Sequence, residues 1–395
     1  MARAGLAPIQ PSSRPPRVAE PAAVDQRRLA APVDTSGIDF IDLALAGTTQ
    51  MVMPEHLDSD FDYQLTRYVE RSGQAYFRLD ITARRSLRKL ATMPKDVVFL
   101  VDISSSIPQD YVNQVVAGLS DALGSLNDGD RFNIVLFREQ ALFLATDEPL
   151  PATPQNIDKA RAFLGEARST GYTDVNRALS RLLVRDDGGP RVYNLVLISD
   201  GRPTKGIQDT RQLINLVTRE NDLNASIYTI AVTRQPNVEL LDFLAYRNKG
   251  FSVTAERLDQ VAPTIRDLMS RLRFPIVKDV ALSVVGLRGG EVYPLQLPNI
   301  HQGERFSVFG RYEPDASGRD DFMVRFTGRS AGQPVDFTFA RDLSEVPQGE
   351  QDLRQGWALL KLHHLYSEMI RQGETKDLLD QIAELRKRYK VKTLY

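Results

Sequence analysis

The sequence predicts an α/β fold, a doubly wound and mostly parallel sheet, flanked by an antiparallel β-sandwich-like module and by C-terminal helices. Two patterns carry this prediction. Between residues 95 and 274, short and almost continuously apolar runs alternate with amphipathic helical stretches, as in a parallel sheet that is covered on both faces. Before and after that region, apolar and polar residues alternate between turn residues, which indicates antiparallel strands.

The composition is that of an ordinary globular protein. Hydrophobic residues make up 42% and charged residues 26% of the 395 residues, and 51 acidic residues nearly balance 50 basic ones. This balance predicts neither nucleic-acid nor membrane affinity. The absence of cysteine excludes disulfides, thiolate metal sites and cysteine nucleophiles. No apolar stretch is long enough to cross a bilayer, and no secretory signal is visible at the start.

The N-terminal region divides into two parts. Residues 1–35 are rich in Pro, Ala and Arg without periodicity, which predicts a disordered leader or linker. Residues 36–94 are expected to be β-rich. In this segment FDYQLTRYV (Phe61–Val69) and AYFRLDI (Ala75–Ile81) alternate apolar and polar residues on either side of a Ser72–Gly73 turn, which predicts a β-hairpin.

Residues 95–274 contain six candidate strands, with helices between most of them. Apolar residues recur at helical spacing from Val112 to Leu123 and from Val175 to Leu182. ALFLA follows its predecessor too closely for a helical crossover, so we expect it to be an antiparallel edge strand. The candidate strands are VVFLV (Val97–Val101), RFNIVLF (Arg131–Phe137), ALFLA (Ala141–Ala145), YNLVLIS (Tyr193–Ser199), SIYTIAV (Ser226–Val232) and FSV (Phe251–Val253).

After Pro275 the alternating pattern returns, with Gly, Pro and Asn between the runs. It predicts a small antiparallel sandwich over residues 275–345. Because β-rich segments lie on both sides of the α/β region, we expect residues 275–345 to pack against residues 36–94, with the α/β domain inserted between them. Residues 346–395 are expected to form two helices, around Arg354–Gln372 and Lys376–Tyr389.

Five oxygen-bearing side chains are expected at one edge of the predicted sheet. In an open α/β sheet, ligands bind outside the carboxyl ends of the strands. One cluster follows the first central strand, one directly precedes a helix that starts near Asp174, and one follows the apolar strand that ends at Ser199. The five residues are Asp102, Ser104, Ser106, Thr173 and Asp200.

Each cluster by itself also fits a purely structural role. Ser and Asp are common turn and N-cap residues, and a chance Asp-x-Ser-x-Ser match is expected in roughly one chain in ten of this length and composition. Thr173 fits a helix cap, and Asp200–Gly201 fits a turn. The convergence of three loops on one sheet edge favours a shared site over three separate turns.

The chemistry of these side chains points to a hard cation. Oxygen ligands select Mg²⁺, Ca²⁺ or Mn²⁺ over zinc or copper. Two carboxylates balance a divalent ion, and five protein oxygens leave one octahedral position for water or an incoming group. Such a site holds its ion weakly alone and more tightly once a partner donates a carboxylate. This chemistry predicts a docking site for a partner that donates a carboxylate, rather than a closed structural metal site.

The pattern of these five residues resembles the metal-ion-dependent adhesion site of von Willebrand factor type A domains. DRFNIVLF (Asp130–Phe137) and SDGRPT also resemble that family in order and spacing. The resemblance implies that Ser104, Ser106 and Thr173 contact the ion through hydroxyls. It implies that Asp102 and Asp200 coordinate the ion directly or through water. Ser105 departs from the glycine of many members, at a position that is not a ligand.

The flanks resemble inter-alpha-trypsin inhibitor heavy chains and their bacterial relatives. The segments that carry this resemblance are AYFRLDI, PKDVVFLVD, LPNIHQGERFSVFGRY (Leu297–Tyr312) and RYKVKTLY. It implies a β-rich module around the type A domain and a periplasmic, cell-surface or secreted location. The Pro-rich leader suits a tether from a membrane anchor further upstream. The C-terminal Asp-Pro-His that couples the animal heavy chains to glycosaminoglycan has no equivalent here.

Three functional hypotheses follow. The leading one is a non-enzymatic, divalent-cation-dependent protein-binding or adhesion module. The second is a structural type A subunit of a larger assembly, without metal-dependent binding. The third is an Mg²⁺-dependent hydrolase that uses Asp102. The sequence disfavours the hydrolase, because Ser104 stands where a second acid is expected and no lysine or histidine base is placed near the three loops.

Overall fold

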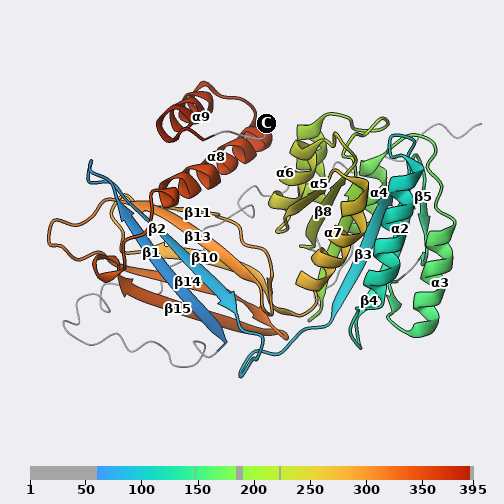
Figure 1. Ribbon diagram of the computed structural model, residues 1–395, viewed down its shortest axis with the longest axis horizontal. Coiled ribbons are helices and arrows are strands. Elements are labelled where there is room, and N and C mark those ends of the chain that lie inside the picture. The colour runs from blue at the N-terminus through green and yellow to red at the C-terminus, as the bar shows by residue number, and fades with distance from the viewer. Residues whose placement is uncertain (1–59, 147, 184–189, 222–223, 392–395) are drawn as a thin grey trace, which may run out of the picture. The chain divides into compact units, whose positions relative to one another are not determined.

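The computed structural model describes residues 60–146, 148–183, 190–221 and 224–391 (Figure 1). The predicted leader, residues 1–35, and the part of the predicted β-rich segment before residue 60 lie outside the described residues. Within these ranges, no helix is long and apolar enough to span a bilayer.

A seven-stranded sheet forms the centre of the α/β part. Its order is β5-β4-β3-β7-β8-β9, with β6 paired to β4. The predicted antiparallel edge strand is confirmed, because β5 pairs antiparallel with β4 at one end of this order. The strands are β3 (Lys95–Asp102), β4 (Arg131–Phe137), β5 (Ala141–Phe143), β6 (Leu150–Pro151), β7 (Val192–Ser199), β8 (Ser226–Val232) and β9 (Ser252–Ala255).

Helices cover both faces of this sheet because its central strands are apolar on both faces. Val97, Phe99 and Val101 of β3 belong to a core shared with α2, α3 and α7. Val98 and Leu100 belong to a core shared with α4, α5 and α6. This arrangement confirms the predicted three-layer, doubly wound fold (Figure 1). The helices are α2 (Gln109–Leu123), α3 (Pro154–Gly165), α4 (Val175–Leu183), α5 (Thr210–Glu220), α6 (Val238–Arg247) and α7 (Leu258–Arg271).

Two four-stranded antiparallel sheets form the sandwich, in the orders β1-β2-β13-β11 and β12-β10-β14-β15. β2 pairs with β13, so strands from before and after the α/β part share one sheet. Phe77, Val308 and Val324 lie in a core between the two sheets. How the chain divides into separately folding domains stays a prediction. The strands are β1 (Phe61–Val69), β2 (Ala75–Ala83), β10 (Pro275–Val285), β11 (Glu291–Tyr293), β12 (Ile300–His301), β13 (Arg305–Tyr312), β14 (Asp321–Ser330) and β15 (Gln333–Asp342).

The two predicted C-terminal helices are α8 (Asp352–Gln372) and α9 (Lys376–Tyr389). Trp357 of α8 is fully buried, with its ring centroid 5.7 Å from that of Tyr76 and 5.5 Å from that of Tyr389. At its other end α8 contacts the α/β part, since Asn215 Nδ2 donates a hydrogen bond to the carbonyl of Ile370 over 2.7 Å. The helix therefore contacts both the sandwich and the α/β part.

A buried ion pair lies at the sheet edge where β3 begins. Lys95 Nζ is bonded to a carboxylate oxygen of Asp130, and both side chains are 1% exposed. The same ammonium donates to the carbonyl of Arg273 over 2.8 Å, directly after α7. Burial lowers the pKa of Lys95, and the adjacent carboxylate of Asp130 opposes that shift. The pair therefore joins the start of β3, the loop before β4 and the exit of α7.

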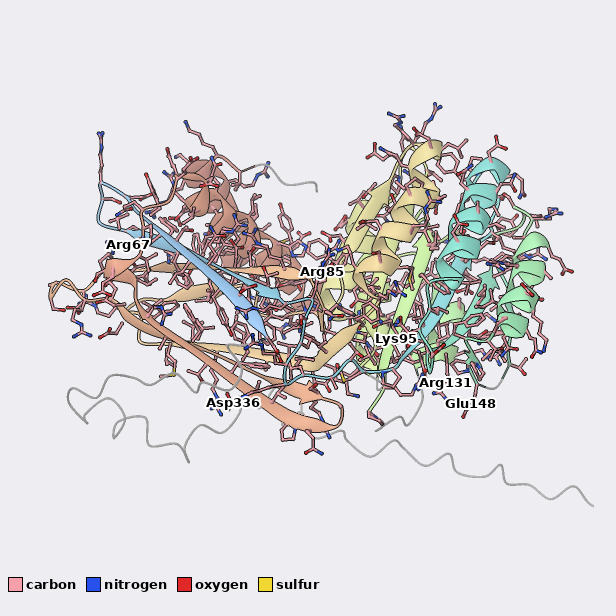
Figure 2. The ribbon with its side chains drawn as sticks, turned by 60° about the horizontal axis from the view of Figure 1, so that its bottom comes forward. Arg67, Arg85, Lys95, Arg131, Glu148 and Asp336 are labelled. Atoms are coloured by element: carbon pink, nitrogen blue, oxygen red, sulfur yellow. The ribbon has the colours of Figure 1, made fainter. Side chains whose placement is uncertain are left out.

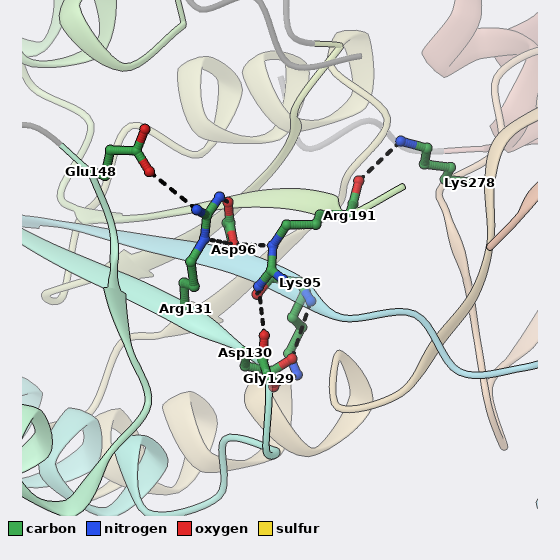
Figure 3. Close-up of polar contacts among 8 residues, drawn as sticks. All are labelled: Lys95, Asp96, Gly129, Asp130, Arg131, Glu148, Arg191 and Lys278. Atoms are coloured by element: carbon green, nitrogen blue, oxygen red, sulfur yellow. Dashed lines mark hydrogen bonds and ion pairs between the residues drawn. The ribbon is translucent and has the colours of Figure 1, made fainter. Parts of the chain in front are cut away.

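A second carboxylate at this edge is held by two arginines (Figures 2 and 3). Asp96 accepts from Arg131 Nε over 2.9 Å and from Arg191 Nε over 2.7 Å. Figure 2 shows Lys95 and Arg131 close together at this end of the sheet. Lys278 of β10 donates to the carbonyl of Arg191 over 3.0 Å, so the network also contacts the sandwich (Figure 3).

We expect Lys95→Met to lower the free energy of unfolding by about 3–5 kcal/mol, because it leaves the Asp130 carboxylate buried and without its cation. The matched control is Arg325→Met, which removes the partly exposed Arg325–Asp336 pair and is expected to cost less than about 1 kcal/mol. Urea denaturation of both variants measures the difference. Equal losses would contradict a special role for the buried pair.

Candidate metal centre

The candidate site lies where the strand order of the sheet reverses. From β3 the chain passes through α2 to β4 on one side, and it later forms β7 on the other side of β3. The carboxyl ends of β3 and β7 therefore flank a topological switch point, the place where open α/β sheets bind ligands. Asp102 is the last residue of β3, and Asp200 directly follows β7.

Asp102 is held through both of its carboxylate oxygens. Oδ1 accepts from the backbone N–H of Ser104 over 3.0 Å, and Oδ2 accepts from the hydroxyl of Ser199 over 2.7 Å. The Asp102 residue is 1% exposed. In the turn that follows, the hydroxyl oxygens of Ser104 and Ser106 lie 3.0 Å apart, and Ser106 is exposed to solvent. The first cluster thus presents one buried carboxylate and two adjacent hydroxyls.

Thr173 contributes a buried hydroxyl that bonds to nothing in the protein. The residue is 0% exposed, and its Oγ1 has no hydrogen-bond partner. The interpretation of Thr173 as the cap of the following helix is wrong. Asp174 caps α4 instead, because its Oδ1 accepts from the N–H of Arg177 over 3.1 Å. A buried hydroxyl without a protein partner is costly, so Thr173 Oγ1 is available to a ligand.

The turn after β7 holds Asp200. Its Oδ1 accepts from the N–H of Arg202 over 3.0 Å, and its carbonyl accepts from Asn237 over 2.7 Å. Gly201 has φ +67°, and a Cβ there would lie 2.9 Å from the carbonyl oxygen of Asn237, so this turn requires glycine. Asp200 is 2% exposed. The predicted turn exists, and it keeps the carboxylate at the sheet edge.

Hydrogen bonds tie the three loops to one another. The N–H of Ser105 donates to the carbonyl of Gly171 over 3.1 Å, which joins the first loop to the loop of Thr173. The N–H of Thr173 donates to the hydroxyl of Thr204 over 2.9 Å, and the carbonyl of Thr173 accepts from Lys205 over 2.9 Å. These bonds join the loop of Thr173 to the loop of Asp200.

Three residues that support the site were missed by the sequence analysis. The Ser199 hydroxyl donates to Asp102 and accepts from the N–H of Gly201 over 2.9 Å, so it links both carboxylate loops. Thr204 holds the backbone of Thr173. Glu139 accepts from the N–H of Tyr172 over 3.0 Å. Ser199 is the last residue of β7 and Thr204 lies in the polar run that follows it, so both were visible in the sequence, whereas nothing in the sequence pairs Glu139 with residue 172.

The donor set fits a hard cation better than a transition metal. Among the described residues, no group of three or more His, Cys, Asp or Glu side chains is arranged to hold a metal ion. The candidate site instead combines two buried carboxylates, a buried free hydroxyl and two further hydroxyls. Such all-oxygen sets suit Mg²⁺, Ca²⁺ or Mn²⁺.

The charge of Asp102 is costly in the metal-free protein. Burial raises the pKa of Asp102 to about 6, hydrogen bonds from Ser199 and Ser104 oppose that rise, and the charge of Asp200 adds to it. An acid whose pKa is raised in the folded state favours folding while it is protonated. That contribution is complete below the unfolded pKa near 3.8 and is lost as the pH rises through about 6.

We therefore expect Asp102→Asn to stabilise the metal-free protein at neutral pH. The gain in unfolding free energy should be small near pH 4, grow up to pH 6 and level off at about 2–3 kcal/mol, since each pKa unit corresponds to about 1.4 kcal/mol. Urea denaturation in EDTA across this pH range measures the gain. A difference between the proteins that does not change with pH would contradict this account.

Comparison with known proteins agrees with the fold. The von Willebrand factor type A domain family matches residues 96–268. The chain is 25% identical over 252 residues to inter-alpha-trypsin inhibitor heavy chain H6 of Homo sapiens, covering 61% of this chain and 19% of that one. It is 24% identical over 311 residues to inter-alpha-trypsin inhibitor heavy chain H1 of Bos taurus, and this match covers 74% of this chain and 34% of the relative.

These two relatives are much longer than the region they share with this chain, which spans about a fifth and a third of their lengths. A solved structure described as von Willebrand factor type A from Catenulispora acidiphila has the same fold, with a TM-score of 0.60 at 15% identity, covering 84% of this chain and 87% of that one. The resemblance to inter-alpha-trypsin inhibitor heavy chains is thus confirmed. Residues 96–268 of this chain match the von Willebrand factor type A domain family and have the fold of such a domain.

Proposed function

We propose that this chain is a divalent-cation-dependent protein-binding module whose ion captures a carboxylate of a partner. One observation carries the proposal above all: Thr173 Oγ1 is a buried hydroxyl without a protein partner, in a loop bonded to the loops of both carboxylates. The proposed ligands are Asp102, Ser104, Ser106, Thr173 and Asp200. Type A domains often bind a divalent metal at this position, which supports the proposal.

The proposed roles follow from the chemistry of the side chains. Asp102 and Asp200 supply the two negative charges that balance a divalent ion. Ser104, Ser106 and Thr173 supply neutral oxygens, which add no further charge and leave the ion attractive to an incoming carboxylate. Mg²⁺ is the proposed ion, with Ca²⁺ or Mn²⁺ as alternatives. Because Ser106 is exposed, we expect an incoming carboxylate to approach the ion from the side of this residue.

A binding function is favoured over hydrolysis. Type A domains and inter-alpha-trypsin inhibitor heavy chains are generally non-enzymatic binding modules. The expectation that no lysine lies near the loops was wrong, because the backbone of Lys205 bonds to Thr173. Its ammonium lies 5.3 Å from the centre of the Tyr172 ring, where it makes a cation–π contact. A lysine ammonium donates hydrogen bonds and accepts none, so it adds a cation to the rim of the site rather than a base.

We expect Mg²⁺ or Mn²⁺ to raise the melting temperature of the wild type. A ligand at 100 times its Kd stabilises the folded state by about 2.7 kcal/mol. Asp102→Ala should abolish the shift. Thr173→Val should weaken it without destabilising the metal-free protein, because it removes a hydroxyl that has no partner.

The matched control for this experiment is Thr229→Val. Thr229 is equally buried, but its hydroxyl donates to the carbonyl of Leu241 over 3.0 Å. This substitution should lower the melting temperature and leave the metal-induced shift intact. No shift in the wild type, or an equal shift in Asp102→Ala, would refute the metal site and favour a structural subunit.

A second experiment tests capture of a partner's carboxylate. A partner retained on the immobilised protein in Mg²⁺ should be released by EDTA. Asp200→Ala should retain none, while its circular dichroism and its unfolding transition show a folded protein. Recognition that survives EDTA would mean that the partner binds the sandwich or another surface, not the ion.

A further inference from the structure

An exposed aromatic residue directly precedes the candidate ligand Thr173. Tyr172 is 59% exposed. Every other Phe, Tyr and Trp among the described residues is buried or partly buried. Tyrosine is enriched in protein interfaces and among the residues that contribute most to binding. The one aromatic ring that folding leaves exposed therefore lies where a partner of the metal site would arrive.

Hydrogen bonds fix the backbone on both sides of Tyr172. The carbonyl of Gly171 accepts from the N–H of Ser105 over 3.1 Å and from its hydroxyl over 2.7 Å. The N–H of Tyr172 donates to Glu139 over 3.0 Å, and the N–H of Thr173 donates to a hydroxyl of the loop after β7 over 2.9 Å. Because both peptide groups that flank Tyr172 are bonded, little backbone entropy is lost when a partner contacts its ring.

Lys205 places a cation on this ring. Its ammonium lies 5.3 Å from the centre of the Tyr172 ring, and the residue is exposed. The N–H groups of Thr204 and Lys205 both donate to the carbonyl of Thr173, over 3.0 and 2.9 Å. The ring and the ammonium therefore form one exposed surface beside Thr173, built from two loops. We call it the Tyr172–Lys205 platform.

The ammonium of Lys205 makes no ion pair with a carboxylate of the described residues. The two acids of the adjoining loops accept from backbone groups instead. Glu139 accepts from the N–H of Tyr172, and Asp174 accepts from the N–H of Arg177. An exposed ammonium that is held against an aromatic ring is therefore able to pair with an incoming carboxylate, in a charge-assisted hydrogen bond.

We propose that the Tyr172–Lys205 platform binds a second acidic residue of the partner. One carboxylate of the partner segment completes the shell of the ion, and the other pairs with Lys205 while its side chain packs on the Tyr172 ring. This inference rests on the proposed metal-dependent function and names the class of partner, a segment with two neighbouring acidic residues. The platform adds the specificity that a lone carboxylate on an ion lacks, since complementary charges select among partners.

Random peptides displayed on phage are the probe. They are selected on the immobilised full chain in Mg²⁺ and eluted with EDTA, and we expect the eluted peptides to carry at least two acidic residues. The affinity of a selected synthetic peptide, measured by fluorescence anisotropy, should fall about two- to fivefold in Lys205→Met and at least about fivefold in Tyr172→Ser. Lys205→Arg and Tyr172→Phe keep the charge and the ring, so they should bind as the wild type does.

The matched control is Lys159→Met, which removes an exposed lysine of α3 and should leave the affinity unchanged. The Mg²⁺-induced rise in melting temperature, measured on every variant, reports the ion separately. Selected peptides with a single acidic residue, or wild-type affinity in both Lys205→Met and Tyr172→Ser, would overturn the platform and leave metal capture standing. A wild type without that rise, or peptides that EDTA does not release, would overturn both proposals.

Discussion

The parallel pairing of β3 with β7 is the interaction on which the candidate site depends. It places Val101 beside Ile198, so Asp102 and Ser199 emerge together at the carboxyl edge of the sheet. The Ser199 hydroxyl then bonds both the Asp102 carboxylate and the turn that holds Asp200. Neither carboxylate is positioned by its own loop alone. Each depends on a strand pairing between segments almost a hundred residues apart in the chain.

The two edges of the sheet differ in whether their buried carboxylates are paired with basic side chains. At the amino edge, Asp130 is neutralised by Lys95, and Asp96 by Arg131 and Arg191. At the carboxyl edge, the ion pairs of the described residues include neither Asp102 nor Asp200, although both are almost completely buried. Buried charge without a counter-charge is unfavourable. The same fold therefore pairs its buried carboxylates with cations at one edge, and Asp102 and Asp200 make no such pair at the other edge, which supports the proposed metal site.

Long apolar strands were predicted well, and the shortest strands were not. The predicted spans of RFNIVLF and SIYTIAV coincide with β4 and β8, because continuous apolar runs in a buried sheet are unambiguous. β6 and β12 contain two residues each, too few to show any periodicity. β11 is also short and ends at Tyr293, before a proline that cannot donate to a ladder.

The candidate ligands were visible in the sequence because a strand that ends in polar residues delivers them to a predictable edge of a parallel sheet. Local patterns were thus enough to predict the fold class and to select the five candidate ligand residues. Only the tertiary structure decided that Asp174 rather than Thr173 caps α4, and therefore that the Thr173 hydroxyl is free. It also brought Glu139 to the backbone N–H of Tyr172. The physical reason is that hydrogen bonds between distant segments depend on how the strands and loops are packed, which no local periodicity records.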